Sequence, residues 1–161
     1  YSFGHKYYDI TPDLICCGKG MGGGIALSGV IGKKKIMDLP EVGNMSSTNS
    51  ANPIACNAGL AVLEEIKKKN LIKNTKIKGK ILFKELNKIK DKNPLSIEKI
   101  NGEGLIAAII FKKNKNIQFK LRELVEKCMS EGLLVVYTGR ESVKIGPPLT
   151  ISKAALFEWV K

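Results

Sequence analysis

The sequence predicts an α/β protein in two parts. Short apolar runs at residues 14–17 and 25–31 lie on either side of a glycine cluster, and apolar runs bounded by turn signals are typical of buried strands. Two longer segments, 54–69 and 71–92, carry the apolar spacing of helices, and short strands and helices alternate after them. We expect a hinge between the two long helices, around residues 69–71.

The first part is organised around the glycine-rich stretch at residues 18–24, which directly follows the first apolar run. Glycine clusters mark positions where the backbone bends sharply or approaches another group closely. Residues 25–31 are expected to return as a second buried strand. Residues 33–38 then predict a short helical turn that ends before Pro40.

A helix is predicted to begin at Asn52 and Pro53, because asparagine caps free N–H groups and proline suits the first helical position. The preceding residues 46–50 are Ser, Ser, Thr, Asn and Ser. A loop followed by a cap explains this cluster without any function. Hydroxyls and free backbone N–H groups before a helix also suit an anion such as phosphate, so both interpretations stay open.

The second part is predicted to begin with the helix at 71–92, which keeps one face apolar from Ile77 onward. Gly79 interrupts this pattern and weakens the prediction of one continuous helix. The following pattern predicts strands at 97–100, 105–111, 133–137 and 142–145, a helix at 117–131, and a last helix capped by Ser152.

The composition allows one modest domain or two small ones. The 161 residues are 43% hydrophobic and carry a formal net charge of +12. A basic chain is a candidate for nucleic-acid binding, but its lysines are spread over several elements without interleaved aromatic residues, and Arg122 and Arg140 are its only arginines. We therefore expect no nucleic-acid partner, and a basic binding module stays as an alternative.

Cysteine usage and hydropathy predict a reduced, cytoplasmic protein. Cys16 and Cys17 are adjacent, and together with Cys56 and Cys128 they form neither a Cys-x-x-Cys pair nor a Cys/His ligand set. His5 is the single histidine, so we expect no metal site and no catalytic triad. No apolar run approaches the roughly 18 residues of a membrane span, so we expect no membrane partner.

Lys19 lies at the junction between the first apolar run and the glycine cluster, and three interpretations of it are open. A lysine in a glycine loop is most often a surface residue. A phosphate-binding P-loop requires Ser or Thr after the lysine, and Gly20 stands there instead. A lysine that forms a Schiff base needs a free, well-placed amine, for which the end of a buried strand is a suitable position.

Four stretches resemble one protein family in the correct order. Residues 12–32, PDLICCGKGMGGGIALSGVIG, resemble the active-site segment of the class III pyridoxal-phosphate aminotransferases, where a short apolar run leads to a lysine and a glycine-rich turn. Further similarity lies in 43–53 (GNMSSTNSANP), 101–111 (NGEGLIAAIIF) and 143–152 (VKIGPPLTIS). The resemblance therefore spans nearly the whole chain.

The resemblance implies the aspartate aminotransferase-like fold of pyridoxal-phosphate-dependent transferases, in partial form. Residues 1–69 would be the C-terminal part of the large cofactor-binding domain, and residues 70–161 the small C-terminal α+β domain. The similarity begins in the middle of a domain. The chain would then be the C-terminal piece of a longer protein, and inactive alone.

The resemblance also implies a site. Lys19 would be catalytic and would hold pyridoxal 5'-phosphate as a Schiff base. Thr48, with Ser47 beside it, would contact the cofactor phosphate of the neighbouring subunit, so that a homodimer shares its active sites. Lys144 stands where the family usually has an arginine that binds a substrate carboxylate, and Arg140 lies four residues earlier. Lysine supplies the charge of arginine but not its planar, two-point contact.

The activity implied is transamination from an amino acid or an ω-amine to a 2-oxo acid. An aminomutase, an epimerase or a decarboxylase of the same superfamily would use Lys19 as well. Outside these enzymes, the alternatives are a non-catalytic remnant and a basic binding module.

Overall fold

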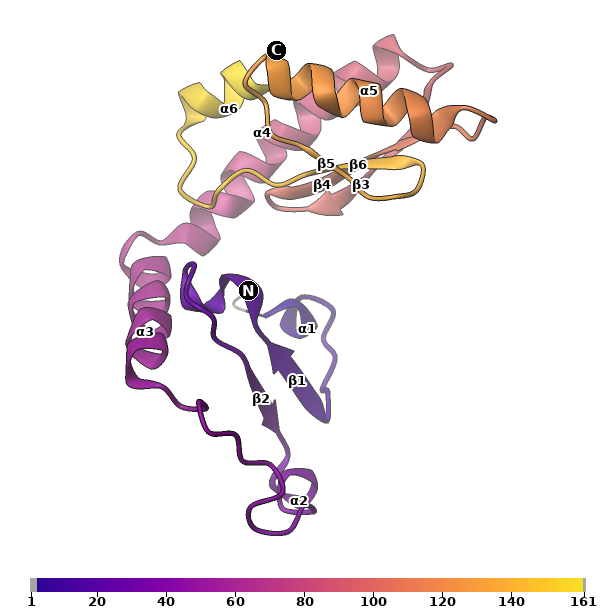
Figure 1. Ribbon diagram of the computed structural model, residues 1–161. Coiled ribbons are helices and arrows are strands. Elements are labelled where there is room, and N and C mark those ends of the chain that lie inside the picture. The colour runs from indigo at the N-terminus through magenta and orange to yellow at the C-terminus, as the bar shows by residue number, and fades with distance from the viewer. Residues whose placement is uncertain (1–2, 161) are drawn as a thin grey trace. The chain divides into compact units, whose positions relative to one another are not determined.

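The computed structural model describes residues 3–160 and divides the chain into two compact units, residues 1–72 and 73–161 (Figure 1). The boundary falls near the start of a long helix, close to the predicted hinge. Each unit has its own set of strands and helices. The assignment of these units to a cofactor-binding domain and a small domain stays a prediction.

The first unit consists of short elements followed by one substantial helix. A two-stranded antiparallel sheet pairs Leu14 with Gly32 at one end and Cys17 with Gly29 at the other. At one end of this sheet, an ion pair of 2.7 Å joins Asp13, which precedes the first strand, to Lys33, which follows the second. The elements are α1 (Gly4–Tyr7), β1 (Leu14–Cys17), the 3-10 turn η1 (Lys19–Gly22), β2 (Gly29–Gly32), α2 (Lys34–Met37) and α3 (Pro53–Lys68).

Two sequence-based expectations for the first unit are wrong. The strands are not buried: Leu14 is 45% exposed and Ile31 is 54% exposed, because a sheet of two strands offers its side chains few neighbours to pack against. The second strand is also shorter than predicted. Residues 25–28 still belong to the glycine turn, where Ile25 N–H donates to the Gly22 carbonyl at 3.0 Å.

The predicted start of the long helix in the first unit is confirmed. Asn52 Oδ1 accepts hydrogen bonds from Ile54 N–H at 2.9 Å and from Ala55 N–H at 3.4 Å, and Pro53 occupies the first turn. The cap satisfies donors that would otherwise be orphaned at the helix terminus. Helix α3 therefore has a fixed starting point immediately after the hydroxyl-rich loop.

The second unit is an antiparallel sheet with three helices. The strand order is β3-β4-β6-β5, and α4, α5 and α6 share one apolar core with the sheet (Figure 1). Its elements are α4 (Leu71–Lys92), β3 (Ile97–Glu103), β4 (Ile106–Phe111), α5 (Ile117–Ser130), β5 (Val136–Tyr137), β6 (Ser142–Ile145) and α6 (Lys153–Trp159). The most deeply buried side chains of the core are Leu82, Leu86, Leu105, Leu121 and Leu156.

Strand β5 is shorter than predicted, because residues 133–135 do not pair with another strand, and Leu134 among them is exposed. Leu133 N–H donates to the Cys128 carbonyl at 2.8 Å, which closes the end of α5, and Val135 is buried in the core. The predicted cap of the last helix is confirmed, since Ser152 Oγ accepts a hydrogen bond from Ala155 N–H at 3.0 Å.

Helix α4 runs without a break through Gly79, so the predicted continuous helix is confirmed and Gly79 does not interrupt it. A Cβ atom at Gly79 would lie 2.5 Å from the Gly104 carbonyl oxygen, closer than any real contact. Glycine is therefore required by packing, because it lets the β3–β4 turn approach the helix backbone.

We expect Gly79→Ala in the full-length protein to lower the free energy of unfolding. The new methyl group meets the backbone of Gly104, and this overpacking should outweigh the gain of about 1 kcal/mol in helix propensity, for a net loss of about 1–2 kcal/mol. Urea unfolding measures the change. Gly146→Ala is the matched control, since a Cβ there meets nothing within 4 Å. A Gly79→Ala protein more stable than this control would contradict the packing argument.

Candidate active site

Lys19 is the first residue of η1 and follows strand β1 after a single glycine. Its backbone has φ +54°, in the left-handed region. For a residue with a side chain this conformation costs roughly 1–2 kcal/mol, so the surrounding structure must hold it in place. Asp9, Ala51 and Asn70 of the same unit share this left-handed backbone, so Lys19 is set apart by its amine and by its place in the glycine turn directly after β1. Its side chain is exposed.

The turn that carries Lys19 is held by short local hydrogen bonds. Met21 N–H donates to the Gly18 carbonyl and Gly23 N–H to the Gly20 carbonyl, both at 3.2 Å. Gly23 has φ +60° and serves as the left-handed end of the turn. Five glycines in residues 18–24 leave little side-chain bulk near the amine. This geometry suits a reaction in which a large planar group must reach Nζ.

Ser47 and Thr48 lie in the loop between α2 and α3, and both are exposed. Ser50 folds the loop back: its Oγ donates to the Ser47 carbonyl at 2.7 Å and its N–H donates to the same oxygen at 3.1 Å. Asn52 already accepts from the first N–H groups of α3. An anion at this loop would therefore be bound by the hydroxyls of Ser47 and Thr48 rather than by those helix N–H groups.

Lys144 and Arg140 belong to the second unit. Lys144 lies in the middle of β6, opposite Ala108 on one side and Val136 on the other. Its neighbours in the strand, Val143 and Ile145, are 3% and 4% exposed. Because side chains alternate along a strand, Lys144 stands on the face opposite to the core, where it is exposed.

Arg140 is an exposed residue of the turn between β5 and β6. The turn is closed by Thr138 and Ser142, whose hydroxyl oxygens lie 2.6 Å apart. The other arginine of the chain is engaged elsewhere, since the Arg122 guanidinium lies 5.8 Å from the centre of the Tyr137 ring, as in a cation–π contact. Arg140 is thus exposed on the turn that leads into β6.

The predicted site residues divide between the two units. Lys19, Ser47 and Thr48 lie in the first unit, and Arg140 and Lys144 in the second. Each unit therefore contributes one kind of group: an amine with hydroxyls in the first, and two cations in the second.

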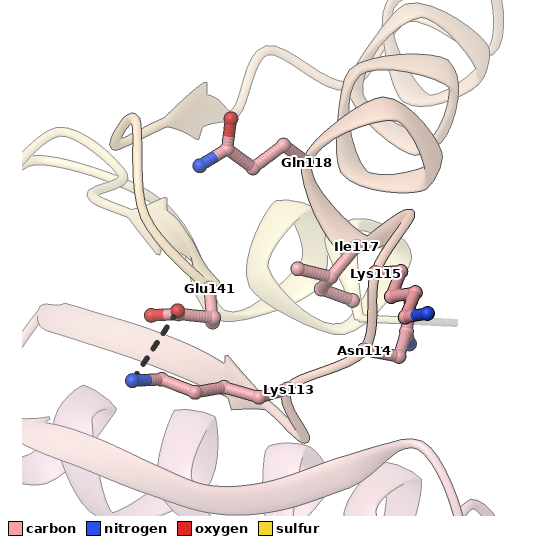
Figure 2. Close-up of a pocket in the computed structure, with 6 residues that line it drawn as sticks. All are labelled: Lys113, Asn114, Lys115, Ile117, Gln118 and Glu141. Atoms are coloured by element: carbon pink, nitrogen blue, oxygen red, sulfur yellow. Dashed lines mark ion pairs between the residues drawn. The ribbon is translucent and has the colours of Figure 1, made fainter.

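The structure also contains a shallow polar pocket that the sequence did not predict. It has a volume of about 310 Å³ and lies in the second unit, beside the start of α5 (Figure 2). Lys113 and Glu141 form an ion pair of 3.7 Å across it. Its lining residues are Lys113, Asn114, Lys115, Ile117, Gln118 and Glu141. None of the predicted site residues lines this pocket, and its residues gave no signal beyond that of a polar turn.

The described residues hold neither a metal-binding cluster nor a membrane-spanning helix. Among residues 3–160 no three His, Cys, Asp or Glu side chains gather in a way that could hold a metal ion. The four cysteines are free. Over the same residues, none of the helices combines the length and the apolar character needed to cross a membrane.

Comparison with solved structures defines the fold class. The chain is similar to acetylornithine aminotransferase from Elizabethkingia anophelis, with a TM-score of 0.86 and 28% sequence identity over 98% of this chain and 39% of that one. An aminotransferase from Bacillus anthracis gives a TM-score of 0.85 at 26% identity. The fold is therefore the α/β fold of the pyridoxal-phosphate-dependent aminotransferases, in part.

Sequence comparison identifies the family. The model of the class III aminotransferases matches residues 1–161, and the chain belongs to that family. It is 35% identical to an acetylornithine aminotransferase of Prochlorococcus marinus over 151 residues and 34% identical to a leucine/methionine racemase of Thermococcus litoralis over 161 residues. The chain spans about a third of the length of these curated relatives, 35% and 36%.

The cofactor of this family is pyridoxal phosphate. The groups present suit that molecule chemically: the Lys19 amine can bond to its aldehyde, and the hydroxyls of Ser47 and Thr48 are ligands for its phosphate. The place of Lys19 in a glycine turn directly after β1 is the structural observation that supports this fit.

We expect Lys19→Gly to stabilise the cofactor-free full-length protein by about 1 kcal/mol, because glycine adopts φ +54° without the strain of a side chain. The unfolding midpoint in urea measures this. Lys35→Gly, at an exposed position inside α2, is the control and should lose about 0.5–1 kcal/mol. A loss of similar size at Lys19 would show that its backbone is not strained.

Proposed function

We propose that the full-length protein is a pyridoxal-phosphate-dependent aminotransferase, which moves an amino group from an amino acid or an ω-amine to a 2-oxo acid. The observation that carries this proposal is the placement of Lys19, the lysine of the family motif, on a strained glycine turn directly after β1. The named relatives, among them acetylornithine aminotransferases, support the reaction class.

Lys19 has two tasks in this reaction. Its Nζ would hold the cofactor covalently, and the same amine, when free, would move a proton at the substrate Cα. When bound, pyridoxal phosphate supplies a conjugated ring that accepts the electrons left at that carbon. The small residues around Lys19 leave its amine room to move between the two tasks.

The hydroxyls of Ser47 and Thr48 hold the cofactor phosphate, and in this proposal they do so for the neighbouring subunit. The active unit is then a homodimer with shared sites, and a monomer is inactive. The exposure of both residues, on a loop shaped by the Ser50 hydrogen bonds, supports a role in contacting another molecule.

The second unit supplies recognition of the substrate carboxylate. Lys144 is a point charge on a flexible stem and binds a carboxylate through one nitrogen, whereas the arginine usual in the family would bind through two. Arg140, in the turn that precedes β6, offers the planar fork that Lys144 lacks. The pair would favour a carboxylate that reaches both groups.

The same proposal covers the setting of the protein. Residues 1–69 are the end of the cofactor-binding domain and residues 70–161 are the small domain of a cytoplasmic protein. The chain of 161 residues is inactive by itself, since the family residues that hold the ring nitrogen and stack on the ring have no counterpart in it.

A second function has specific support. The leucine/methionine racemase of Thermococcus litoralis is 34% identical to this chain, which is nearly the identity of the acetylornithine aminotransferase. A racemase or epimerase would also use Lys19, but it returns the proton to the same carbon and needs no 2-oxo acid. Dependence of turnover on an added 2-oxo acid separates the two reactions, and an aminomutase or a decarboxylase would likewise proceed without one.

We expect Lys19→Ala in the full-length protein to remove covalent cofactor binding and to lower turnover by at least about 1,000-fold, because both tasks of the amine are lost. Borohydride treatment followed by mass spectrometry of the peptides detects the link. Lys35→Ala, an exposed lysine of α2, is the control and should behave as wild type. A cofactor absorption band like that of wild type in Lys19→Ala would contradict the proposal and favour a binding module or a remnant.

We expect Lys144→Ala to raise KM for donors with a carboxylate by about 10-fold, since a charge-assisted hydrogen bond contributes about 1.5–3 kcal/mol. Donors without a carboxylate should be unaffected. Lys144→Arg should retain or improve binding. The control is Lys99→Ala, an exposed lysine of β3. Equal effects on both kinds of donor would remove Lys144 from carboxylate recognition.

A further inference from the structure

We propose that Gly59 and Val62 of α3 are positioning residues for Lys19, which hold the η1 turn by direct packing and thereby set the place of the lysine amine. This inference rests on the proposed role of Lys19. It assigns to α3 a part in the chemistry that goes beyond connecting the loop at 47–48 to the second unit.

The hydrogen bonds inside the Lys19 turn do not fix its position relative to α3. The hydrogen bonds of η1 join residues three apart, such as Gly18 with Met21 and Gly20 with Gly23. Such bonds fix the shape of a turn but not its position in the unit. A strained residue inside the turn also needs an external support, because the turn would otherwise relax.

Gly59 of α3 lies close to this turn. Gly59 is buried in the middle of α3. A Cβ atom there would lie 2.6 Å from Leu27 Cδ2 and 3.6 Å from the carbonyl oxygen of Met21, two residues after Lys19. The Leu27 side chain, which follows the turn, therefore occupies the space of a missing side chain, and the Met21 carbonyl of η1 lies at van der Waals distance from it.

Val62 makes a second contact with the turn from the same face of the helix. Val62 follows Gly59 by three residues, so both point to one side of α3. A Cβ atom at Gly23 would lie 2.8 Å from Val62 Cγ2, and Gly23 has φ +60°. The turn is thus held at its middle by Gly59 and at its end by Val62. Ala55, also buried, continues this face by one helical turn.

The support is itself firmly placed. Helix α3 is 16 residues long, begins at the Asn52 cap and ends with an ion pair between Glu65 and Lys69. A long capped helix moves as a unit, whereas an isolated turn does not. The position of Lys19 therefore depends on α3 as well as on the β1–β2 ladder, which pairs Cys17 with Gly29 on either side of the segment that carries the turn.

The test is Gly59→Val in the full-length protein, which is freed of its cofactor and then reloaded with pyridoxal phosphate. The substitution inserts a branched side chain between α3 and the turn. We expect the rate of covalent linkage of pyridoxal phosphate to Lys19, followed by borohydride trapping and mass spectrometry, to fall at least about 10-fold, because a shift of about 1 Å at a reacting group costs about 100-fold in rate. Noncovalent cofactor binding should change less than linkage. Leu27→Ala in the same protein should restore much of the rate by making room.

Ala61→Val is the matched control, since it places the same side chain on the exposed face of the same helix. Wild-type linkage in a folded Gly59→Val protein would overturn the proposal, and so would a loss that Leu27→Ala does not reduce. If Gly59→Val fails to fold, Val62→Ala decides: slower linkage supports positioning, and an unchanged rate overturns it. Absence of Lys19 linkage in the wild-type protein would instead refute the proposed function, and the inference with it.

Discussion

The left-handed backbone of Lys19 is the constraint around which the first unit is built. A residue at φ +54° persists because something else holds it, and the packing of α3 against η1 supplies that force. The glycines of the turn are then not a sign of flexibility. Gly23 ends the turn in a left-handed conformation, and its missing side chain leaves space for Val62. The same glycine therefore permits the bend and lets α3 pack against it.

The two units solve different chemical problems. The first presents a nucleophilic amine, which has to be positioned closely and left unobstructed. The second presents cations on an exposed sheet face and turn, where, in the proposed function, they would meet an anionic group of a substrate. Lys144 can do so because its strand neighbours Val143 and Ile145 are committed to the core, which leaves the alternate position free.

Local signals in the sequence predicted what local physics decides. The Asn52 cap, the Ser152 cap and the long helices follow from donors, acceptors and spacing close along the chain. Two predictions were wrong: that β1 is buried, and that the second strand includes residues 25–28. Both depend on which neighbouring segments a strand contacts. Gly79 was misjudged for the same reason: its partner, the Gly104 carbonyl, is 25 residues away in the sequence.

The candidate site shows the same division. The motif around Lys19 was readable, but neither its strain nor the support from Gly59 leaves a trace in residue order, since both arise from a contact between η1 and α3. That contact also joins two proposed roles, because α3 begins at Pro53, five residues after Thr48. In a dimer with shared sites, a displacement of this helix would move the amine of one site and the phosphate ligands of the other together. Helix α3 is then the element through which the two sites would affect each other.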